Sequence, residues 1–168
     1  MLIMKKILFF HILFTWFVFI NLAEASVGYI DINFLLQESN KGKKLIDELN
    51  IIKQNNEDLF NSKQNELENE KNNLNKIKNI TAEDEFKKKV SELQKKINDF
   101  NTFKNDKILL FDELKKSKLN NFFASLNEIL DNYVKKNEIK IILDKKNVII
   151  AEQSLDITDE ILTLINRE

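Results

Sequence analysis

Residues 81–100 read TAEDEFKKKVSELQKKINDF, and their pattern decides the fold of the chain. Apolar residues recur at steps of four, three, four and three, which is the spacing of a coiled-coil seam. They are Phe86, Val90, Leu93, Ile97 and Phe100. Thr81 can cap this helix, and the acidic residues at 83–85 suit its positive N-terminus. The pattern continues to Asn137 and predicts a helix of about 80 Å, at about 1.5 Å per residue, which is too long for a compact domain.

A second apolar stripe precedes this helix in the sequence. The helical pattern fades between the two, at residues 78–80. The second stripe consists of Leu45, Leu49, Ile52, Leu59, Leu67 and Leu74. If the chain folds back at Ile80, the numbers of facing residues sum to about 160, and the two stripes align. The aligned pairs are Leu49 with Phe111, Ile52 with Ile108, Phe60 with Phe100, Leu67 with Leu93, and Leu74 with Phe86. We therefore expect an antiparallel helical hairpin with its tip near residues 78–82.

Polar residues interrupt the first stripe at Asn56, Lys63 and Glu70, which should weaken the distal half of the hairpin and leave it flexible. The register sets Lys63 against Ile97 and Glu70 against Val90, two poor pairs. Residues 108–111 are ILLF, and four consecutive apolar residues cover every side of a helix. One partner helix cannot bury them all, so they either contact a body or neighbouring subunits or stay partly exposed.

The first 25 residues read as a cleavable secretory signal, with two early lysines, an apolar middle at 7–20 and the small-x-small sequence AEA at 23–25. Cleavage is expected between Ala25 and Ser26. The alternative is an uncleaved membrane anchor, but a spanning helix needs about 20 apolar residues. This run is shorter and is interrupted by His11 and Thr15.

The composition argues against an enzyme. The formal net charge is −1, and a near-neutral charge argues against a general nucleic-acid binder. There is no cysteine, and the only histidine, His11, lies in the signal, so the mature chain lacks the commonest general base and the thiol nucleophile. Asp31 and Asp144 each follow a strand-like run and could form a catalytic pair, but capping or turn roles are favoured. We expect no enzymatic activity, no cofactor and no metal.

Strand-like segments flank the hairpin. Residues 27–32 read as a strand, Asn33 can cap a helix from Phe34, and Gly42 marks a kink. Residues 139–143, a turn at 144–147 and residues 148–151 read as a β-hairpin. Asp156 or Thr158 then caps a final helix, whose apolar face is Ile161, Leu162 and Ile165.

The predicted fold class is therefore α+β and mostly helical. Residues 26–42 and 138–168 form a small β-body with a terminal helix, and residues 43–137 form a long helical arm inserted in it. Three strands make a thin sheet whose open edges must be covered or paired, and oligomerisation through the sheet would do so. The candidate sheet and oligomer residues are Val27, Tyr29, Ile30, Ile32, Ile141, Leu143, Val148 and Ile150.

Segments near both ends carry a resemblance to a known family. They are VGYID at 27–31 directly after the signal, ILD at 142–144 before VI at 148–149, and LDITDEIL at 155–162. Together with the long charged hairpin, they make the mature chain similar to the Skp/OmpH family of periplasmic chaperones. The resemblance implies a homotrimer with a shared β-body and three projecting arms. It also implies an ATP-independent holdase that keeps unfolded outer-membrane proteins from aggregating on their way to the outer membrane.

Candidate client contacts follow from this resemblance and are the large apolar residues Phe86, Phe100, Phe103, Leu110 and Phe123. Phe86 and Phe100 also serve the seam, where packing is the favoured role. The arm tip has a net positive charge, because eight lysines outnumber four acidic residues. The lysines are Lys71, Lys76, Lys78, Lys87, Lys88, Lys89, Lys95 and Lys96. Such a tip attracts acidic clients or anionic membrane, or it is a solvated helix face.

Two questions about partners stay open at this point. The slightly acidic chain leaves contact with lipopolysaccharide undecided, and contact with the outer-membrane assembly machinery is equally open. The main alternative function is an envelope coiled-coil scaffold or adaptor, which would bind one folded partner. A holdase would instead suppress the aggregation of several unrelated unfolded proteins. A prefoldin-like chaperone also combines helical hairpins with a β-body, but the signal disfavours that cytosolic family.

Overall fold

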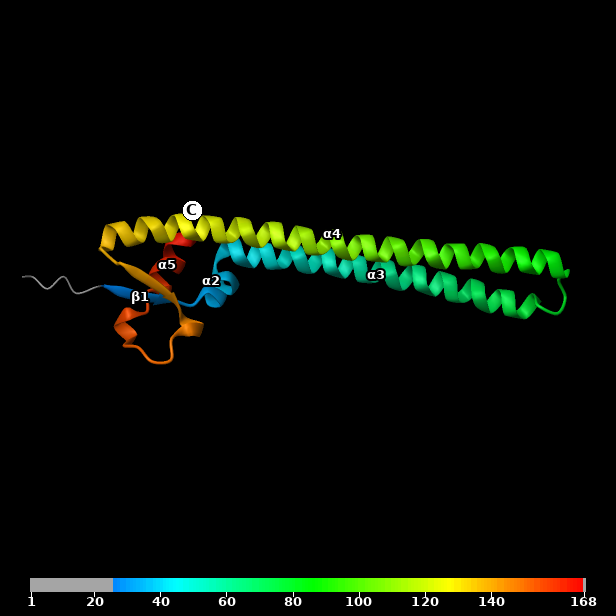
Figure 1. The fold of residues 1–168 in the computed structure, drawn as a ribbon, viewed down its shortest axis with the longest axis horizontal. Helices are drawn as coiled ribbons and strands as arrows, with labels where there is room; N and C mark the ends of the chain where they lie inside the picture. Colours follow the sequence, from blue (N-terminus) through cyan, green and yellow to red (C-terminus); the bar gives the residue numbers. More distant parts are fainter. Residues whose placement is uncertain (1–25, 168) are drawn as a thin grey trace, which may run out of the picture.

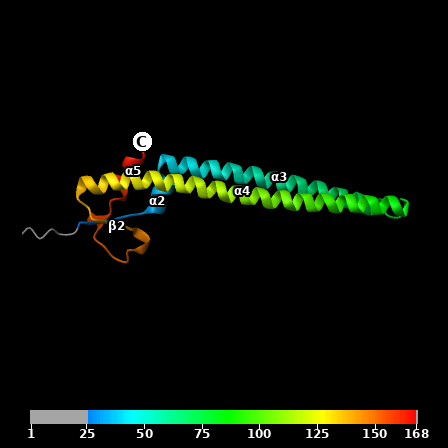
Figure 2. The ribbon, with the colours of Figure 1, turned by 45° about the horizontal axis from the view of Figure 1, so that its top comes forward.

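The computed structural model describes residues 26–167. The predicted signal, which ends at Ala25, lies outside the described residues. Two long antiparallel helices, α3 (Asn40–Ile77) and α4 (Glu83–Asn137), lie side by side and project from a small body (Figure 1). The body contains β1 (Val27–Ile30), α2 (Ile32–Glu38), β2 (Ile141–Asp144) and α5 (Thr158–Ile165). Figure 2 shows the same pairing of α3 and α4 from a second direction. The predicted fold class, a helical arm inserted in a small β-body, is confirmed.

The arm helices have the lengths that the sequence pattern predicts. α3 has 38 residues and α4 has 55, and α4 ends at Asn137 as expected. Glu138 follows in the left-handed conformation, with φ 56°, which ends the helix. Acidic residues occupy the first turn of α4, but Ala82 is at its N-cap and makes no side-chain hydrogen bond. The predicted cap by Thr81 is therefore wrong.

The joint between α2 and α3 lies at Ser39. Its extended backbone separates the two helices, and its buried hydroxyl accepts a hydrogen bond from the Gly42 N–H at 3.1 Å. The predicted kink at Gly42 is misplaced by three residues. Gly42 is needed for a different reason, because a Cβ there would clash with the backbone carbonyl oxygen of Leu36. The predicted Asn33 cap is also wrong, since Asp31 Oδ1 accepts from the Phe34 N–H at 2.9 Å and α2 begins earlier.

The sheet has two strands, not three. β1 and β2 pair in parallel, with Val27 opposite Ile141 and Ile30 opposite Asp144. Parallel strands need a long crossover connection, and the arm supplies it. On the other side of β1, an isolated bridge joins Tyr29 to Asp156.

The predicted β-hairpin over residues 139–151 is wrong. After β2 the chain turns into a short 3₁₀ helix at Lys145–Asn147, because Asp144 Oδ1 accepts from the Lys146 N–H at 3.2 Å. Residues 148–151 then pair with no strand in the described part of the chain. Val148 and Ile150, predicted as sheet residues, therefore lie outside the sheet, and Ile150 is 91% exposed.

One hydrophobic core joins the body to the root of the arm. The body contributes Ile30, Leu35, Ile139, Ile157, Ile161 and Ile165, and the arm contributes Leu45, Leu49, Phe122, Leu126 and Ile129. The predicted apolar face of the last helix is confirmed, since Ile161 and Ile165 are buried and Leu162 packs against them. At the start of that helix, Asp156 Oδ1 accepts from the Thr158 N–H at 3.1 Å, but the N-cap residue is Ile157, so the predicted N-cap at Asp156 or Thr158 is wrong. This shared core fixes the direction in which the arm leaves the body.

Candidate functional site

The middle of the arm is loosely packed. On α3 no side chain is buried between Leu49 and Leu74, and on α4 none is buried between Leu93 and Phe122. Most of the intervening seam residues are half-buried, and Leu59 and Ile108 are exposed. The arm is therefore closed firmly at its root and near its tip, with a weaker stretch between.

An aromatic pair lies in this stretch. The rings of Phe60 and Phe103 meet edge to face, with centroids 6.3 Å apart and an interplanar angle of 87°. The ammonium groups of Lys63 and Lys107 lie 5.4 and 5.7 Å from the Phe103 centroid. Lys104 lies 5.7 Å from the Phe60 centroid. Lysines thus cover both aromatic rings with cation–π contacts.

The predicted register of the hairpin is wrong by about one helical turn. Phe60 meets Phe103 instead of Phe100, and Glu70 pairs with Lys96 instead of facing Val90, with 2.7 Å between Lys96 Nζ and Glu70 Oε1. In Figure 1 the connection continues past the end of α3, so α4 begins farther from the body than α3 ends. In the observed register two of the polar seam residues have partners, since Lys63 lies over the Phe103 ring and Glu70 pairs with Lys96.

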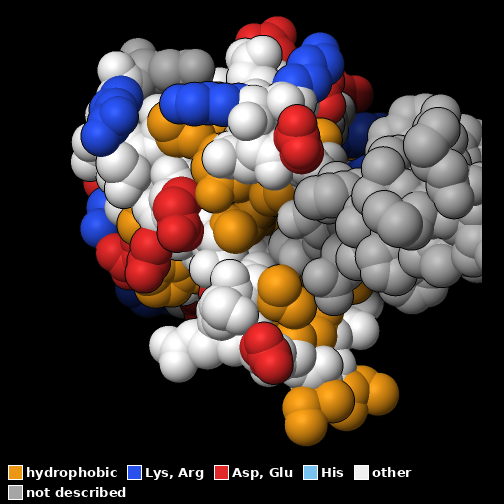
Figure 3. Space-filling model, turned by 90° about the vertical axis from the view of Figure 1, so that its left-hand side faces the viewer, with side chains coloured by type: hydrophobic (Ala, Val, Ile, Leu, Met, Phe, Trp, Pro, Cys, Tyr) orange, Lys and Arg blue, Asp and Glu red, His pale blue; other side chains and the backbone are white. Residues whose placement is uncertain are grey.

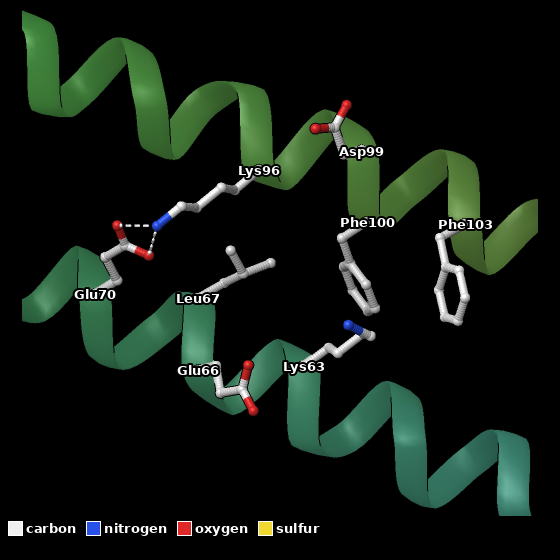
Figure 4. Close-up of a pocket in the computed structure, with 8 residues that line it drawn as sticks. All are labelled: Lys63, Glu66, Leu67, Glu70, Lys96, Asp99, Phe100 and Phe103. Atoms are coloured by element: carbon white, nitrogen blue, oxygen red, sulfur yellow. Dashed lines mark hydrogen bonds and ion pairs between the residues drawn. The ribbon is translucent and has the colours of Figure 1, made fainter.

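A cavity of about 420 Å³ opens beside this seam (Figure 4). The rings of Phe100 and Phe103 point from α4 toward α3, and the Lys63 side chain reaches toward them, while Glu70 and Lys96 close one end. Its lining is completed by Glu66, Leu67 and Asp99. Because charged groups surround the aromatic rings, this cavity offers an apolar floor with a rim of mixed charge.

A second cavity, of about 490 Å³, lies nearer the body. Its apolar lining is Phe60, Ile108 and Phe111, and its polar lining is Lys53, Asn56, Glu57, Asn61, Gln64 and Lys104. Sequence reasoning chose none of its apolar residues as candidate contacts. Phe60 and Phe111 were assigned to the seam, and only the corrected register shows that a groove opens between them and Ile108.

The candidate client contacts fall in different places. Phe100 and Phe103 lie together at the first cavity, and Phe86 is half-buried near the tip. Leu110 is 59% exposed on α4, beside Leu109 at 62%. Phe123 is at the root of the arm, where its ring lies edge to face with Phe122 and packs against the shared core. The structure therefore brings two of the five residues together.

The basic tip is partly neutralised. Lys87 pairs with Glu83 at 2.6 Å, Lys89 with Glu85 at 3.4 Å, and Lys96 with Glu70. Within residues 26–167, five of the eight tip lysines make no ion pair: Lys71, Lys76, Lys78, Lys88 and Lys95. Ile80, at the end of the arm, is 83% exposed. The tip thus presents unpaired positive charge around an apolar residue.

The body exposes a second apolar surface. Ile149 is fully exposed, and Ile141 and Leu143 project from β2 with 50% and 43% of their surface exposed. Figure 3 shows apolar side chains among charged ones at this end of the molecule. Of the other predicted sheet residues, Ile30 is buried and Val27, Tyr29 and Ile32 are half-buried. The sheet therefore faces the core on one side only.

Asp31 and Asp144 have the predicted structural roles. Asp31 caps α2, and Asp144 turns the chain after β2 and pairs with Lys146 at 2.9 Å. The hydrogen bond from Lys146 lowers the pKa of the Asp144 carboxyl, although its partial burial opposes this. In the described part of the chain, no group of three or more His, Cys, Asp or Glu residues is placed to hold a metal ion. None of the helices within residues 26–167 has the length and apolarity needed to cross a membrane.

The structure is thus a small β-body with a long helical hairpin inserted between its two strands. The sequence model of the family described as outer membrane protein (OmpH-like) matches residues 26–165. The chain belongs to this OmpH-like family.

A solved structure has the same fold. It is the crystal structure of an OmpH-like protein from Caulobacter crescentus CB15, described as a candidate outer membrane chaperone. The two chains are 21% identical, with a TM-score of 0.78, and the match covers 86% of each. At this identity the likeness establishes the fold alone. No curated protein matches the chain significantly.

Proposed function

We propose that this protein is an ATP-independent holdase chaperone of the periplasm, where it binds unfolded outer-membrane proteins and prevents their aggregation in transit. Membership of the OmpH-like family supports a chaperone of this type. The signal-like residues 1–25 support export from the cytoplasm. Family membership favours a binding protein over an enzyme.

The observation that carries the proposal is the loosely packed middle of the arm. Large apolar side chains remain exposed or half-exposed there, and cavities open along the seam. An unfolded membrane protein offers many apolar segments, each able to contact an arm weakly. Several weak contacts give useful avidity, because each contact after the first is effectively intramolecular.

We place three copies of the chain in the working molecule, joined through the body. The number three comes from the family resemblance. The exposed apolar surface of β2 and residues 149–150, which a neighbouring subunit would cover, supports contact through the body. Three arms around a shared body would enclose a client and supply the multivalency. The unpaired tip lysines would attract acidic segments of a client, or an anionic membrane surface, at low salt.

Light scattering of the mature protein, alone and with a urea-diluted outer-membrane β-barrel protein, tests the proposal. The chaperone should be trimeric alone, and it should hold the client in a soluble complex of defined size. Several unrelated β-barrel clients should be held. Aggregation at the same rate with and without the protein would refute the holdase, and capture of one folded protein only would identify an adaptor.

A further inference from the structure

The second cavity of the arm differs from the other exposed apolar surfaces because it is a groove with a floor. Phe60 of α3 and Ile108 and Phe111 of α4 line it, and the half-buried rings of Phe60 and Phe111 give it apolar walls. Ile108 keeps 43% of its surface exposed, although it lies in the groove. The neighbouring Leu109 is more exposed, at 62%, but does not line the groove.

The rim of this groove has one positive charge, on Lys104, without an acidic partner among the described residues. Lys53 and Glu57 pair across one turn of α3 at 3.8 Å. Lys104 contacts only the face of Phe60 and makes no ion pair within the described residues. A carboxylate that approaches the groove therefore meets an ammonium group that is free to pair with it.

The groove alone is too small to form an interface with a folded partner. A stable interface between folded proteins takes roughly 20–30 residues on each side, whereas nine residues line this groove. Its volume of about 490 Å³ admits one large side chain together with part of the backbone that carries it. Strands of outer-membrane barrels alternate apolar and polar residues, so an extended segment can insert one apolar side chain while its neighbours stay at the rim.

We propose that this groove, formed by Phe60, Ile108, Phe111 and Lys104, is a binding site for one aromatic or branched apolar side chain of an unfolded outer-membrane strand, with a nearby client carboxylate paired to Lys104. The inference rests on the proposed holdase function and assigns that function to a defined place on the arm. In the proposed oligomer every arm has this groove, so several grooves together can hold a client that a single groove binds only weakly.

Matched substitutions of neighbouring residues test the site. Ile108→Ser removes apolar surface from the groove, whereas Leu109→Ser removes more exposed apolar surface outside it. Affinity is measured by the anisotropy of a dye-labelled, urea-diluted eight-stranded barrel protein. Circular dichroism and light scattering confirm that both variants keep their helices and oligomeric state. We expect Ile108→Ser to weaken binding about fivefold and Leu109→Ser less than about twofold.

The outcomes separate the groove from the general function. Equal losses of client affinity in the two variants, or a larger loss for Leu109→Ser, would mean that the client adheres to any exposed apolar surface. This result would refute the groove as a binding site and leave the proposed holdase function intact. A wild-type protein that binds no client overturns both. Lys104→Gln should weaken binding about twofold at low salt and have no effect at high salt, and equal effects at both would refute the paired carboxylate.

A spectroscopic probe identifies the occupant. The only tryptophan, Trp16, lies in the signal, so Phe111→Trp gives the mature protein a single reporter in the groove. Adding a tryptophan-free barrel client should shift its emission to the blue, whereas a control reporter, Ile51→Trp, should shift little, because Ile51 is exposed outside the groove. A blue shift that depends on protein concentration without client would show that a second arm fills the groove, and would overturn the proposal.

Discussion

The Asp31 backbone N–H donates a hydrogen bond to Thr158 Oγ1 at 2.9 Å, across a separation of 127 residues. The Thr158 hydroxyl in turn donates to Asp156 Oδ1 at 2.5 Å. A single buried side chain therefore ties the end of β1 to the start of α5. Because the arm lies between these points in the sequence, this chain of hydrogen bonds closes the body around the root of the arm.

Thr158→Ala should destabilise the protein by about 1–3 kcal/mol, because the Asp31 N–H and the Asp156 carboxylate both lose a buried partner. Thr163→Ala is the matched control. Its exposed hydroxyl only donates to the Asp159 carbonyl within α5, so the change should stay within about 0.5 kcal/mol. Urea denaturation followed by circular dichroism measures both, and equal stabilities would contradict the role of Thr158.

The two glycines of the chain should respond differently to alanine. At Gly42 a methyl group would clash with the backbone carbonyl oxygen of Leu36, which cannot move without separating α2 from α3. At Gly28 the nearest atom is Ile157 Cδ1, 3.1 Å away, the end of a side chain that can shift. Gly42→Ala should therefore cost about 2 kcal/mol or more, and Gly28→Ala about 1 kcal/mol or less, in urea denaturation. The reverse order would show that the joint tolerates a Cβ.

Acid should weaken the body through Asp156. Its partial burial opposes the charged form, but hydrogen bonds from Thr158 and Lys145 outweigh this and hold the pKa of the carboxyl below its ordinary value of 3.8. A carboxyl with a lowered pKa contributes stability above its unfolded pKa and loses it as the pH falls through the folded pKa. Asp156→Asn should thus lower the urea midpoint at pH 7, and its difference from the wild type should shrink below about pH 4. A gap that stays constant between pH 7 and pH 3 would exclude this effect.

Hydrogen exchange should reveal the weak stretch of the arm. Amides of α3 between residues 52 and 70, where no side chain is buried, should exchange faster than those beside Leu45 and Leu49 or those of α4 beside Phe122 and Leu126. Exchange should be fastest in the turn around Ile80. Mass spectrometry of exchanged peptides measures this, and uniform protection along α3 would contradict a flexible arm.

The exposed isoleucines of the body should matter for assembly. Ile149→Ser combined with Ile150→Ser should shift the oligomer toward monomers, because both side chains are almost fully exposed in the single chain and would be covered by a neighbour. Ile80→Ser removes a similarly exposed side chain at the far end of the arm and should leave the oligomer unchanged. Light scattering after size-exclusion chromatography distinguishes the two, and an intact oligomer in the double variant would place the interface elsewhere.

Local patterns in the sequence predict the helical part of this fold well. Leu45, Leu49, Leu74 and Leu93 were identified from helical spacing alone, and all four are buried. The register could not be read in the same way, because a shift of one turn replaces apolar pairs by other apolar pairs. Only specific contacts such as Glu70 with Lys96 distinguish the alternatives, and these depend on how far the connection continues past the end of α3.

The sheet was harder to predict for a related reason. Residues 148–151 have the β-branched composition of a strand, but composition does not provide a partner, and β2 pairs instead with β1, far away in the sequence. The groove was missed because Phe60 and Phe111 were assigned to the seam of the predicted register. The pattern alone therefore predicts the arm, while the sheet and the groove depend on contacts between distant residues.

The parallel pairing of β1 with β2 also sets an order of events as the chain emerges, N-terminus first, from the membrane that it crosses in the proposed export. Val27 emerges long before Ile141, so β1 has no partner until the whole arm has emerged. The two arm helices can begin to pair at the tip, where Leu74 and Leu93 are close in sequence, while the body is still incomplete. The body is then the last part to form, and until it does, each new chain carries an open strand of its own.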